Sequence, residues 1–309
     1  MPTHCFAASL DSASRLTARR SGAYNVAMTT NYGVTEINAP ETSSLFAVEI
    51  ENLVRRFGDF TAVDHINLRI KGGQFFGFLG PNGAGKSTTI KMLTGLLKPT
   101  SGRIRVLGHD PQTLDVKKRI GVVPEDLNLF ERLTGAEMLQ FTGRMYGMER
   151  TEITERTREL LSLMELSDEP KKLIVEYSHG MKKKLSLACA LIHRPEILFL
   201  DEPFEGVDAI ASRTLKDLLS RLTARGLTVF LTSHVLEIVE RLCTDIAIIA
   251  QGRIVAHGSL AELRRGIAVE DDAQAGTPIN AAPVSLEDYF IRVVGGTQRT
   301  GDEVLEWLG

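Results

Sequence analysis

The segment of residues 80–87 restricts the possible folds of this chain more than any other part of its sequence. It reads GPNGAGKS, which fits the pattern G-x-x-x-x-G-K-[ST], and it lies between the apolar run Phe75–Leu79 and a stretch of helical spacing that begins at Lys86. Glycines in such a loop let backbone N–H groups curl around phosphate oxygens at a helix N-terminus. We therefore predict a phosphate-binding strand–loop–helix unit rather than an incidental glycine-rich turn, with Lys86 neutralising phosphate charge and Ser87 ligating Mg²⁺.

A second motif combines an apolar strand with two acids. Four apolar residues at positions 197–200 are followed by Asp201 and Glu202. A wholly apolar strand is typical of a parallel sheet buried on both faces, and such sheets bind ligands at the C-terminal ends of their strands. We expect Asp201 to hold Mg²⁺ and Glu202 to polarise an attacking water, since phosphoryl transfer depends on positioning and charge compensation. Two acids before Pro203 would more often form a solvated turn if they stood alone, but the phosphate-binding loop in the same domain reverses that preference.

Short β-branched runs alternate with segments of helical spacing from Phe46 onward, which predicts an α/β fold. Between about residues 125 and 195 only helical patterns occur, and Thr134 with Glu137 forms a T-x-x-E capping box. This stretch predicts a helical subdomain inserted into the α/β domain. The strands we expect cover residues 46–50, 66–70, 75–79, 197–200, 227–231, 246–250 and 253–256.

The two ends of the chain differ from the middle. Residues 1–45 are rich in Ser, Thr and Ala and are expected to be a disordered tail, with a transit peptide or a true start at Met28 as alternatives. Residues 265–284 have no periodicity and contain several Gly and Pro, so a linker is expected there. Residues 285–309 begin with a second capping box, Ser285 with Asp288, which predicts a short C-terminal helix with an apolar face.

Composition narrows the possible partners. Lys and Arg number 36 against 39 for Asp and Glu, a net charge of -3, so nothing in the overall charge predicts binding to nucleic acid or to an anionic membrane. The apolar runs are strand-sized and far shorter than a membrane span, so the chain is not expected to cross a membrane by itself. Three cysteines without a C-x-x-C pair argue against a disulfide framework or a zinc site.

Several further motifs, in order, give the chain a family resemblance. Residues 177–181, YSHGM, are similar to the signature of ABC transporter ATPases, residues 206–208 to the D-loop, His234 to the H-loop histidine, and Phe57 to the aromatic residue that stacks on adenine. Over residues 46–264 the chain resembles the ATP-binding subunit of an ABC transporter. Each residue also has a plainer interpretation: Phe57 as a core aromatic, Asp208 as a helix N-cap, and His234 as a polar loop residue.

This resemblance implies a P-loop core with a mixed sheet, and an ATPase that dimerises head to tail around two molecules of ATP with Mg²⁺. It implies catalytic roles for Glu202, His234 and Lys86, and metal ligation by Ser87 and Asp201. The nucleotide-binding residues that it implies are Phe57, Gly80, Pro81, Asn82, Gly83, Ala84, Gly85, Lys86, Ser87, Thr88, Glu125, Ser178, Gly180 and Asp208, with Ser178 and Gly180 serving the other subunit's nucleotide.

The resemblance also implies a partner. The stretches around Glu125, residues 177–181 and residues 285–290 look like the branch that pairs with separately encoded ABC-2-type exporter permeases, at the cytoplasmic face of the cell membrane. A non-transport ABC ATPase acting on ribosomes or nucleic acid is an alternative, but those proteins are expected to carry two cassettes or a long coiled-coil insert. A P-loop kinase would leave the signature and His234 unexplained.

Two departures from the family pattern stand out. Glu125 occupies the place of the usual glutamine, which adds negative charge near the triphosphate, and His179 replaces the first glycine of the signature. In addition, residues 182–184 are three lysines in the first two turns of the helix that Ser178 is expected to cap, where the helix dipole disfavours cations. We expect either that an anion, the other subunit's γ-phosphate, relieves this conflict, or that the lysines point to solvent.

Overall fold

The computed structural model describes residues 46–168, 170–263 and 285–295. The expected N-terminal tail, the linker and the end of the C-terminal segment lie outside these residues. Among the described residues, no helix is both long and apolar enough to cross a membrane. Cys189 and Cys243 are free thiols, as the cysteine spacing predicts, and Cys5 is not among the described residues.

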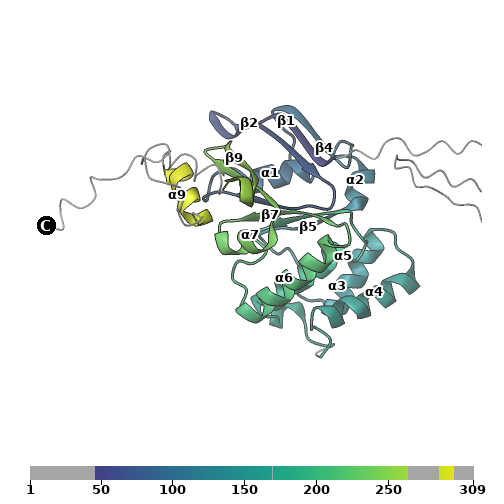
Figure 1. The fold of residues 1–309 in the computed structure, drawn as a ribbon. Helices are drawn as coiled ribbons and strands as arrows, with labels where there is room; N and C mark the ends of the chain where they lie inside the picture. The colour runs from purple at the N-terminus through teal and green to yellow at the C-terminus, as the bar shows by residue number, and fades with distance from the viewer. Residues whose placement is uncertain (1–45, 169, 264–284, 296–309) are drawn as a thin grey trace, which may run out of the picture. The chain divides into compact units, whose positions relative to one another are not determined.

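A six-stranded mixed sheet forms the centre of the fold (Figure 1). Five of its strands are parallel, and the last pairs antiparallel with its neighbour. In spatial order the strands are β5 (Ile120–Val123), β6 (Ile197–Asp201), β7 (Thr228–Ser233), β3 (Phe75–Leu79), β8 (Asp245–Ala250) and β9 (Arg253–Ser259). The carboxyl ends of the parallel strands share one edge, so the segments that follow β3, β5, β6 and β7 meet there.

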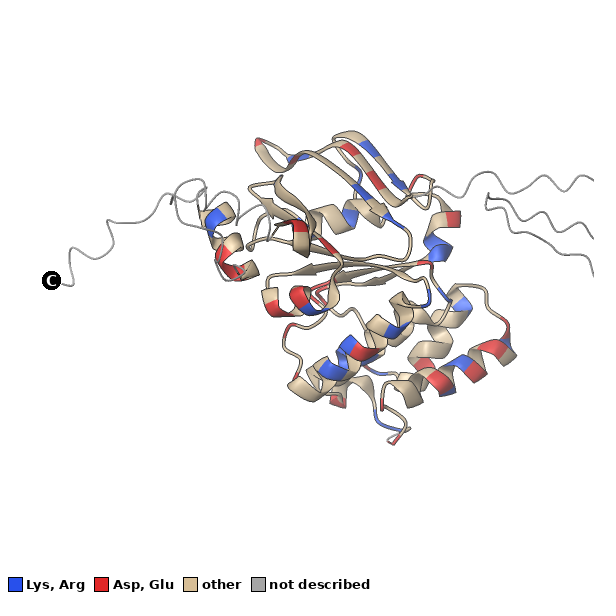
Figure 2. Ribbon diagram, viewed as in Figure 1, with Lys and Arg blue, Asp and Glu red and all other residues tan. Residues whose placement is uncertain are grey.

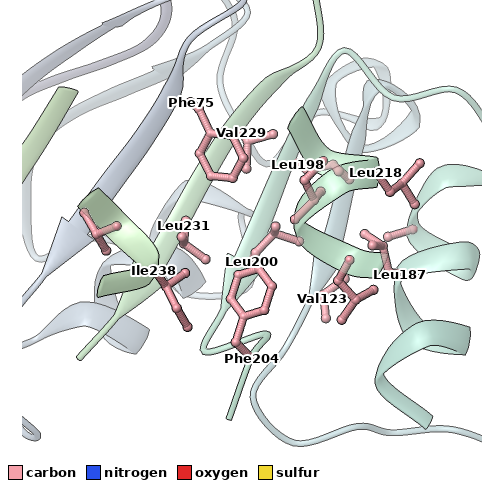
Figure 3. Close-up of a cluster of buried hydrophobic side chains, with 14 of the residues drawn as sticks. Phe75, Val123, Leu187, Leu198, Leu200, Phe204, Leu218, Val229, Leu231 and Ile238 are labelled. Atoms are coloured by element: carbon pink, nitrogen blue, oxygen red, sulfur yellow. The ribbon is translucent and has the colours of Figure 1, made fainter. Parts of the chain in front are cut away.

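Both faces of this sheet are buried, which explains the continuous apolar runs of its strands. Successive side chains of a strand point to opposite faces. In β6, Leu198 and Leu200 pack into one apolar cluster while Ile197 and Phe199 pack into the other. Figure 3 shows the first cluster, where Phe75, Val229 and Leu231 meet Leu218 and Ile238 from the covering helices.

A three-stranded antiparallel sheet covers the second face. Its order is β2 (Phe60–Lys71), β1 (Phe46–Phe57) and β4 (Ser101–Val106), and helix α1 (Lys86–Leu93) lies between it and the central sheet (Figure 1). Buried side chains of both sheets join Ile90, Met92 and Leu93 of α1 in one cluster. This packing fixes the N-terminus of α1 beside the end of β3.

Helices cover the first face. They are α3 (Gly135–Met145), α4 (Arg150–Leu163), a short 3-10 turn (Ile174–Glu176), α5 (His179–Leu191), α6 (Ala209–Thr223) and α7 (Leu236–Leu242). The short α2 (Leu114–Arg119), which precedes β5, instead adds its buried Val116 to the cluster of the second face. The predicted capping box at the start of α3 is present, because the Thr134 hydroxyl accepts the Glu137 N–H and the Glu137 carboxylate accepts the Thr134 N–H. Acidic and basic residues alternate along α4 (Figure 2), the pattern of a helix with one solvated face.

Helix α9 (Leu286–Gly295) follows the second predicted capping box, in which the Ser285 hydroxyl accepts the Asp288 N–H. Its buried Leu286 donates its N–H to the Glu240 carboxylate of α7. The expected strands are all present, although β1, β2 and β9 are longer than predicted by several residues and β6, β7 and β8 differ from their expected bounds by one or two residues. Strands β4 and β5 and helix α2 are additional elements that the sequence pattern did not reveal.

Candidate functional site

The loop of residues 80–85 passes so close to other backbone that it requires glycine. A Cβ atom on Gly80 would lie 2.3 Å from the Ile249 carbonyl oxygen, and one on Gly85 would lie 2.5 Å from the Ala62 carbonyl oxygen. Gly85 also has φ +108°, which is outside the range of ordinary side chains. The loop therefore presents backbone rather than side chains at the N-terminus of α1, where the first N–H groups have no intrahelical acceptor.

Lys86 begins α1 and folds back over this loop. Its ammonium donates to the Gly80 carbonyl at 2.8 Å and to the Pro81 carbonyl at 3.3 Å, and the residue is only 6% exposed. The same ammonium lies 3.5 Å from the Glu202 carboxylate at the end of β6. The structure thus brings together the two motifs that were predicted independently from the sequence.

The end of β6 holds two buried acids with different partners. Asp201 Oδ1 accepts the Thr232 hydroxyl at 2.6 Å, and the same hydroxyl accepts the Glu202 N–H at 3.1 Å. Thr232 is fully buried opposite Asp201 in the parallel pairing of β6 and β7. This threonine is a site residue that sequence reasoning missed, and only the strand register could have identified it.

The Glu202 carboxylate lies between two cations or potential cations. Oε2 is 3.1 Å from His234 Nδ1, and Oε1 faces the Lys86 ammonium but makes no hydrogen bond within the described part of the chain. Glu202 also has φ +47°, a left-handed conformation that costs a non-glycine residue about 1–3 kcal/mol. A buried acid held in this way, with one oxygen unsatisfied, is arranged for a ligand rather than for stability.

The signature residues gather at the N-termini of two helices. Ser178 caps α5 as expected, because its hydroxyl accepts the Met181 N–H at 3.2 Å. Asp208 caps α6 by accepting the N–H groups of Ile210 and Ala211, so its plainer interpretation is correct. Those backbone donors lower the pKa of the Asp208 carboxyl, the Ala211 N–H most strongly. Gly180 packs against Asp208, since a Cβ there would lie 3.3 Å from Asp208 Oδ2.

His179, the departure from the signature, has a structural counterpart. A Cβ on Gly206, which has φ +66°, would lie 3.0 Å from the imidazole of His179. The ring therefore rests on the bare backbone of the loop that precedes α6. A side chain at position 206 would displace the imidazole, so His179 and Gly206 fit each other.

The three lysines of α5 have partners inside the subunit, so the expectation that they point to solvent is wrong. Lys182 pairs with Glu131 at 2.8 Å and Lys184 with Glu165 at 2.6 Å. Lys183 donates to the carbonyl oxygens of Glu202 at 3.1 Å and Glu125 at 3.4 Å. Lys183 and Lys184 are buried rather than solvated, and each positive charge near the helix N-terminus is offset by acids or carbonyls of the same chain.

Glu125 follows β5 on the exposed side of this edge. Partial burial raises the pKa of its carboxyl, and the negative charges of Asp201 and Glu205 raise it further. The Glu125 carboxylate therefore lies in the electric field of these acids. Phe57 lies at the end of β1 with 47% of its surface exposed and with the Arg55 guanidinium 4.3 Å from its ring, so it is not a core aromatic.

Comparison with known proteins places these features in a family. A family model described as "ABC transporter" matches residues 63–205. The linearmycin resistance ATP-binding protein LnrL of Bacillus subtilis is 40% identical over 218 residues, which cover 70% of each chain. The daunorubicin/doxorubicin resistance ATP-binding protein DrrA of Streptomyces peucetius is 39% identical over 225 residues, 72% of this chain and 68% of that protein.

Solved structures agree with these relatives. A solved structure of the ATP-binding subunit of an ABC transporter superimposes with a TM-score of 0.71 at 28% identity, covering 80% of this chain and 99% of that one. A dimeric post-hydrolysis structure of the ATP-binding cassette MJ0796, with ADP and Pi bound, has a TM-score of 0.64 at 25% identity and covers 69% and 98% of the two chains. Fold, motifs and relatives agree, and this chain belongs to the ABC transporter family as an ATP-binding subunit that hydrolyses ATP.

Proposed function

We propose that this subunit binds ATP with Mg²⁺ on residues 80–88, hydrolyses it with Glu202 as the residue that polarises the attacking water, and thereby powers a separately encoded membrane permease that exports its substrate. The observation that carries the site assignment is the Glu202 carboxylate, buried at the sheet edge between Lys86 and His234. Phosphoryl transfer needs charge compensation and a positioned water more than covalent chemistry; Lys86 offers the positive charge, and the Glu202 carboxylate is a group that could position the water.

Each residue of the loop has a physical task in this proposal. Backbone N–H groups of the loop and of the first turn of α1 would face the phosphate oxygens, and Lys86 would exchange its loop carbonyls for the β- and γ-phosphates. His234 holds one oxygen of Glu202 and, 43% exposed, reaches toward the nucleotide as well. Phe57, exposed at the end of β1, offers its ring to adenine.

The donor set fits Mg²⁺. Asp201 is buried and its carboxylate is fixed by Thr232, while Ser87 follows Lys86 in the first turn of α1. Mg²⁺ is commonly held by one or two carboxylates together with phosphate oxygens and water, and this pair offers one carboxylate and one hydroxyl. When bound, the ion would neutralise phosphate charge.

A second subunit completes the site in this proposal. Ser178 and Gly180 stand at the N-terminus of α5, a helix end that favours an anion, and both resemble signature residues that contact nucleotide across a dimer. Asp208, at the N-terminus of α6, packs against Gly180. The dimeric structure of a similar cassette, with ADP and Pi bound, supports a dimer of two subunits.

An exposed apolar patch on the helical subdomain supports a protein partner. Phe130 is 54% exposed and meets Phe141 edge-on at 5.2 Å between ring centroids. Exposed Leu173 and Val175 lie alongside, because the N–H of Val175 bonds the Glu131 carbonyl and Leu173 bridges to Thr134. Grouped exposed aromatics of this kind mark protein interfaces, and we assign this patch to the permease. The names of LnrL and DrrA, both resistance proteins, support export.

Paired variants test the site assignment. Lys86→Ala should abolish ATP binding, because it removes the charge that faces the phosphates. Glu202→Gln should bind ATP normally and lose about 10²- to 10⁴-fold in hydrolysis rate, the range for loss of a residue that handles a proton. Nucleotide titration and phosphate release separate the two effects, and hydrolysis at the parental rate in Glu202→Gln would refute the role of Glu202.

A further inference from the structure

Lys183 is a buried cation in contact with the candidate catalytic edge. It is 2% exposed, and its ammonium donates to the Glu202 carbonyl at 3.1 Å and lies 3.4 Å from the Glu125 carbonyl. A lysine ammonium offers three hydrogen atoms, so these two carbonyls account for most of its donors. Lysine is almost never buried this deeply unless it is paired, and its position therefore has a specific cause.

The Glu202 carbonyl belongs to the strained residue of the site. Glu202 has φ +47°, and such a conformation persists only where the surroundings hold it. Two donors converge on its carbonyl oxygen: the Lys183 ammonium at 3.1 Å and the Glu205 N–H at 3.2 Å. On the amino side, Thr232 holds the Glu202 N–H. Together these contacts clamp both peptide groups of Glu202, which fixes the direction in which its carboxylate points.

The charge of Lys183 has equally specific surroundings. Burial lowers the pKa of its ammonium, whereas the negative charges of Glu205, Glu125, Asp201 and Glu202 oppose that shift. The charges of four carboxylates thus favour the protonated form of this internal cation. The neighbouring lysines differ, because Lys182 and Lys184 pair with Glu131 and Glu165, outside this acidic group.

We propose that Lys183 is a positioning residue for ATP hydrolysis: it holds Glu202 in its productive conformation and ties α5 to the segments that follow β5 and β6. This inference rests on the proposed role of Glu202. Lys183 touches only the backbone of Glu202, so it acts on the reaction through the placement of that carboxylate. Misplacement of a catalytic group by about 1 Å costs up to about 100-fold in rate, so loss of Lys183 lowers kcat with little effect on ATP binding.

The test compares Lys183→Met with Lys183→Gln in the full chain, each alone and combined with Glu202→Gln. Methionine keeps the length of the side chain but donates no hydrogen bond, whereas glutamine restores a donor for the carbonyls. Lys182→Met is the matched control, because it makes the same chemical change one residue earlier on an exposed ion pair. The readouts are kcat and KM for ATP, with thermal unfolding as a check on folding.

We expect Lys183→Met to lower kcat by about 10- to 100-fold with less than about a threefold change in KM, and Lys183→Gln to recover part of that loss. In the Glu202→Gln background, Lys183→Met should change the residual rate less than about twofold, because two residues that act through one group are not additive. If Lys183→Met does not fold, the same comparison is made with Lys183→Gln, in the parental protein and in Glu202→Gln.

Parental kcat in both Lys183 variants, or an equal fold loss with and without the Glu202 carboxylate, would overturn the proposal. Failure of the site assignment gives a different result, because Glu202→Gln alone would then hydrolyse ATP at the parental rate.

Discussion

At the scale of single residues, the site depends on three side chains that hold two carboxylates in place. Thr232 binds Asp201 and the Glu202 N–H, His234 binds the Glu202 carboxylate, and Lys183 binds the Glu202 carbonyl. None of these contacts is optimal for stability, because they bury charge at the edge of the sheet. They define where each carboxylate oxygen lies, which is what phosphoryl transfer requires.

Thr232→Val tests how much the buried Thr232 hydroxyl contributes to the free energy of unfolding. Valine has nearly the same shape but leaves Asp201 Oδ1 and the Glu202 N–H without their shared partner. We expect the free energy of unfolding, measured by denaturant titration without nucleotide or metal, to fall by about 2 kcal/mol, the cost of an unsatisfied buried polar group beside a charge.

Thr94→Val is the control for this change. Thr94 is also buried and donates its hydroxyl to the Ile90 carbonyl, but that carbonyl still accepts the Thr94 N–H after substitution. Its loss should be about 1 kcal/mol or less. Equal losses of unfolding free energy in the two variants would mean that the hydrogen bond from Thr232 to the Asp201 carboxylate contributes no more than an ordinary buried hydroxyl.

Glu125→Gln tests the residue that departs from the family pattern. The raised pKa of Glu125 reflects partial burial and the nearby negative charges of Asp201 and Glu205, so its own charge opposes a triphosphate. Removing it should tighten ATP binding by about two- to tenfold at low Mg²⁺ and by less at high Mg²⁺, where the metal and salt screen the site.

The measurement is ATP affinity at several Mg²⁺ concentrations. Glu149→Gln, which removes one charge at the start of α4 in the helical subdomain, serves as the control. Identical affinities for Glu125→Gln and the parent throughout would place Glu125 outside the field of the phosphates.

At the scale of helices and strands, the first turns of α5 link the helical subdomain to the sheet through Lys183, and the segment just after the C-cap of α5 does so through His193. The imidazole Nε2 donates to the Ile120 carbonyl of β5 at 2.9 Å, and the ring stacks on Tyr146 at 3.7 Å between centroids. Burial lowers the pKa of His193 below its ordinary value of 6.5, since a charged imidazole would lose hydration there. The helix end is therefore sensitive to protonation.

His193→Gln should change how stability depends on pH. Because the pKa of His193 is lower in the folded state, the unfolded chain binds the proton more readily, and stability is lost as pH falls below about 6.5. Unfolding midpoints measured between pH ~8 and ~5 should fall more in the parent than in His193→Gln, which has no titrating group there. Parallel curves for the two proteins would exclude His193 as the cause.

The same elements show what the sequence could and could not predict. Strands buried on both faces, such as β6, can be recognised in the sequence as apolar runs. The capping boxes likewise allow the starts of α3 and α9 to be predicted. Strand β4 was missed because only Ile104 and Val106 of its six residues are buried, and β5 because four residues with a central glycine resemble a loop.

In α5, the sequence did not reveal that Lys183 and Lys184 are buried. Lys183 and Lys184 stand three and four residues after buried Gly180, in phase with the helix stripe, but lysine is a surface residue by default. Their partners lie 19 residues or more away in sequence, so only the fold could reveal them. The phosphate loop and the two acids were predictable because their chemistry is local to one turn.

At the scale of the whole molecule, the described residues place the site motifs in two separate groups. Lys86, Glu202 and His234 meet directly, whereas Ser178, Gly180 and Asp208 gather at the paired N-termini of α5 and α6. Helix α5 joins the groups within one chain through Lys183. In a head-to-tail dimer, each nucleotide would lie between the first group of one subunit and the second group of the other.

This arrangement predicts an ATP-dependent dimer whose formation depends on charge at position 178. In the Glu202→Gln background, which should hold ATP without hydrolysing it, saturating Mg·ATP should convert the subunit to a dimer in size-exclusion chromatography with light scattering. Ser178→Asp keeps a helix N-cap, because aspartate caps as well as serine, but sets a negative charge against the γ-phosphate of the facing subunit. A unit charge near a phosphate, even at an effective dielectric of about 20, costs about 2–4 kcal/mol, enough to weaken the dimer by more than tenfold.

The ATP affinity of the monomer should not change in the Ser178→Asp variant, because Ser178 belongs to the second group and the monomer binds ATP with the first group. Dimerisation of the Ser178→Asp protein at the parental ATP concentration would show that the N-terminus of α5 does not face nucleotide, whereas a Glu202→Gln protein that stays monomeric with Ser178 intact would count against the head-to-tail arrangement itself.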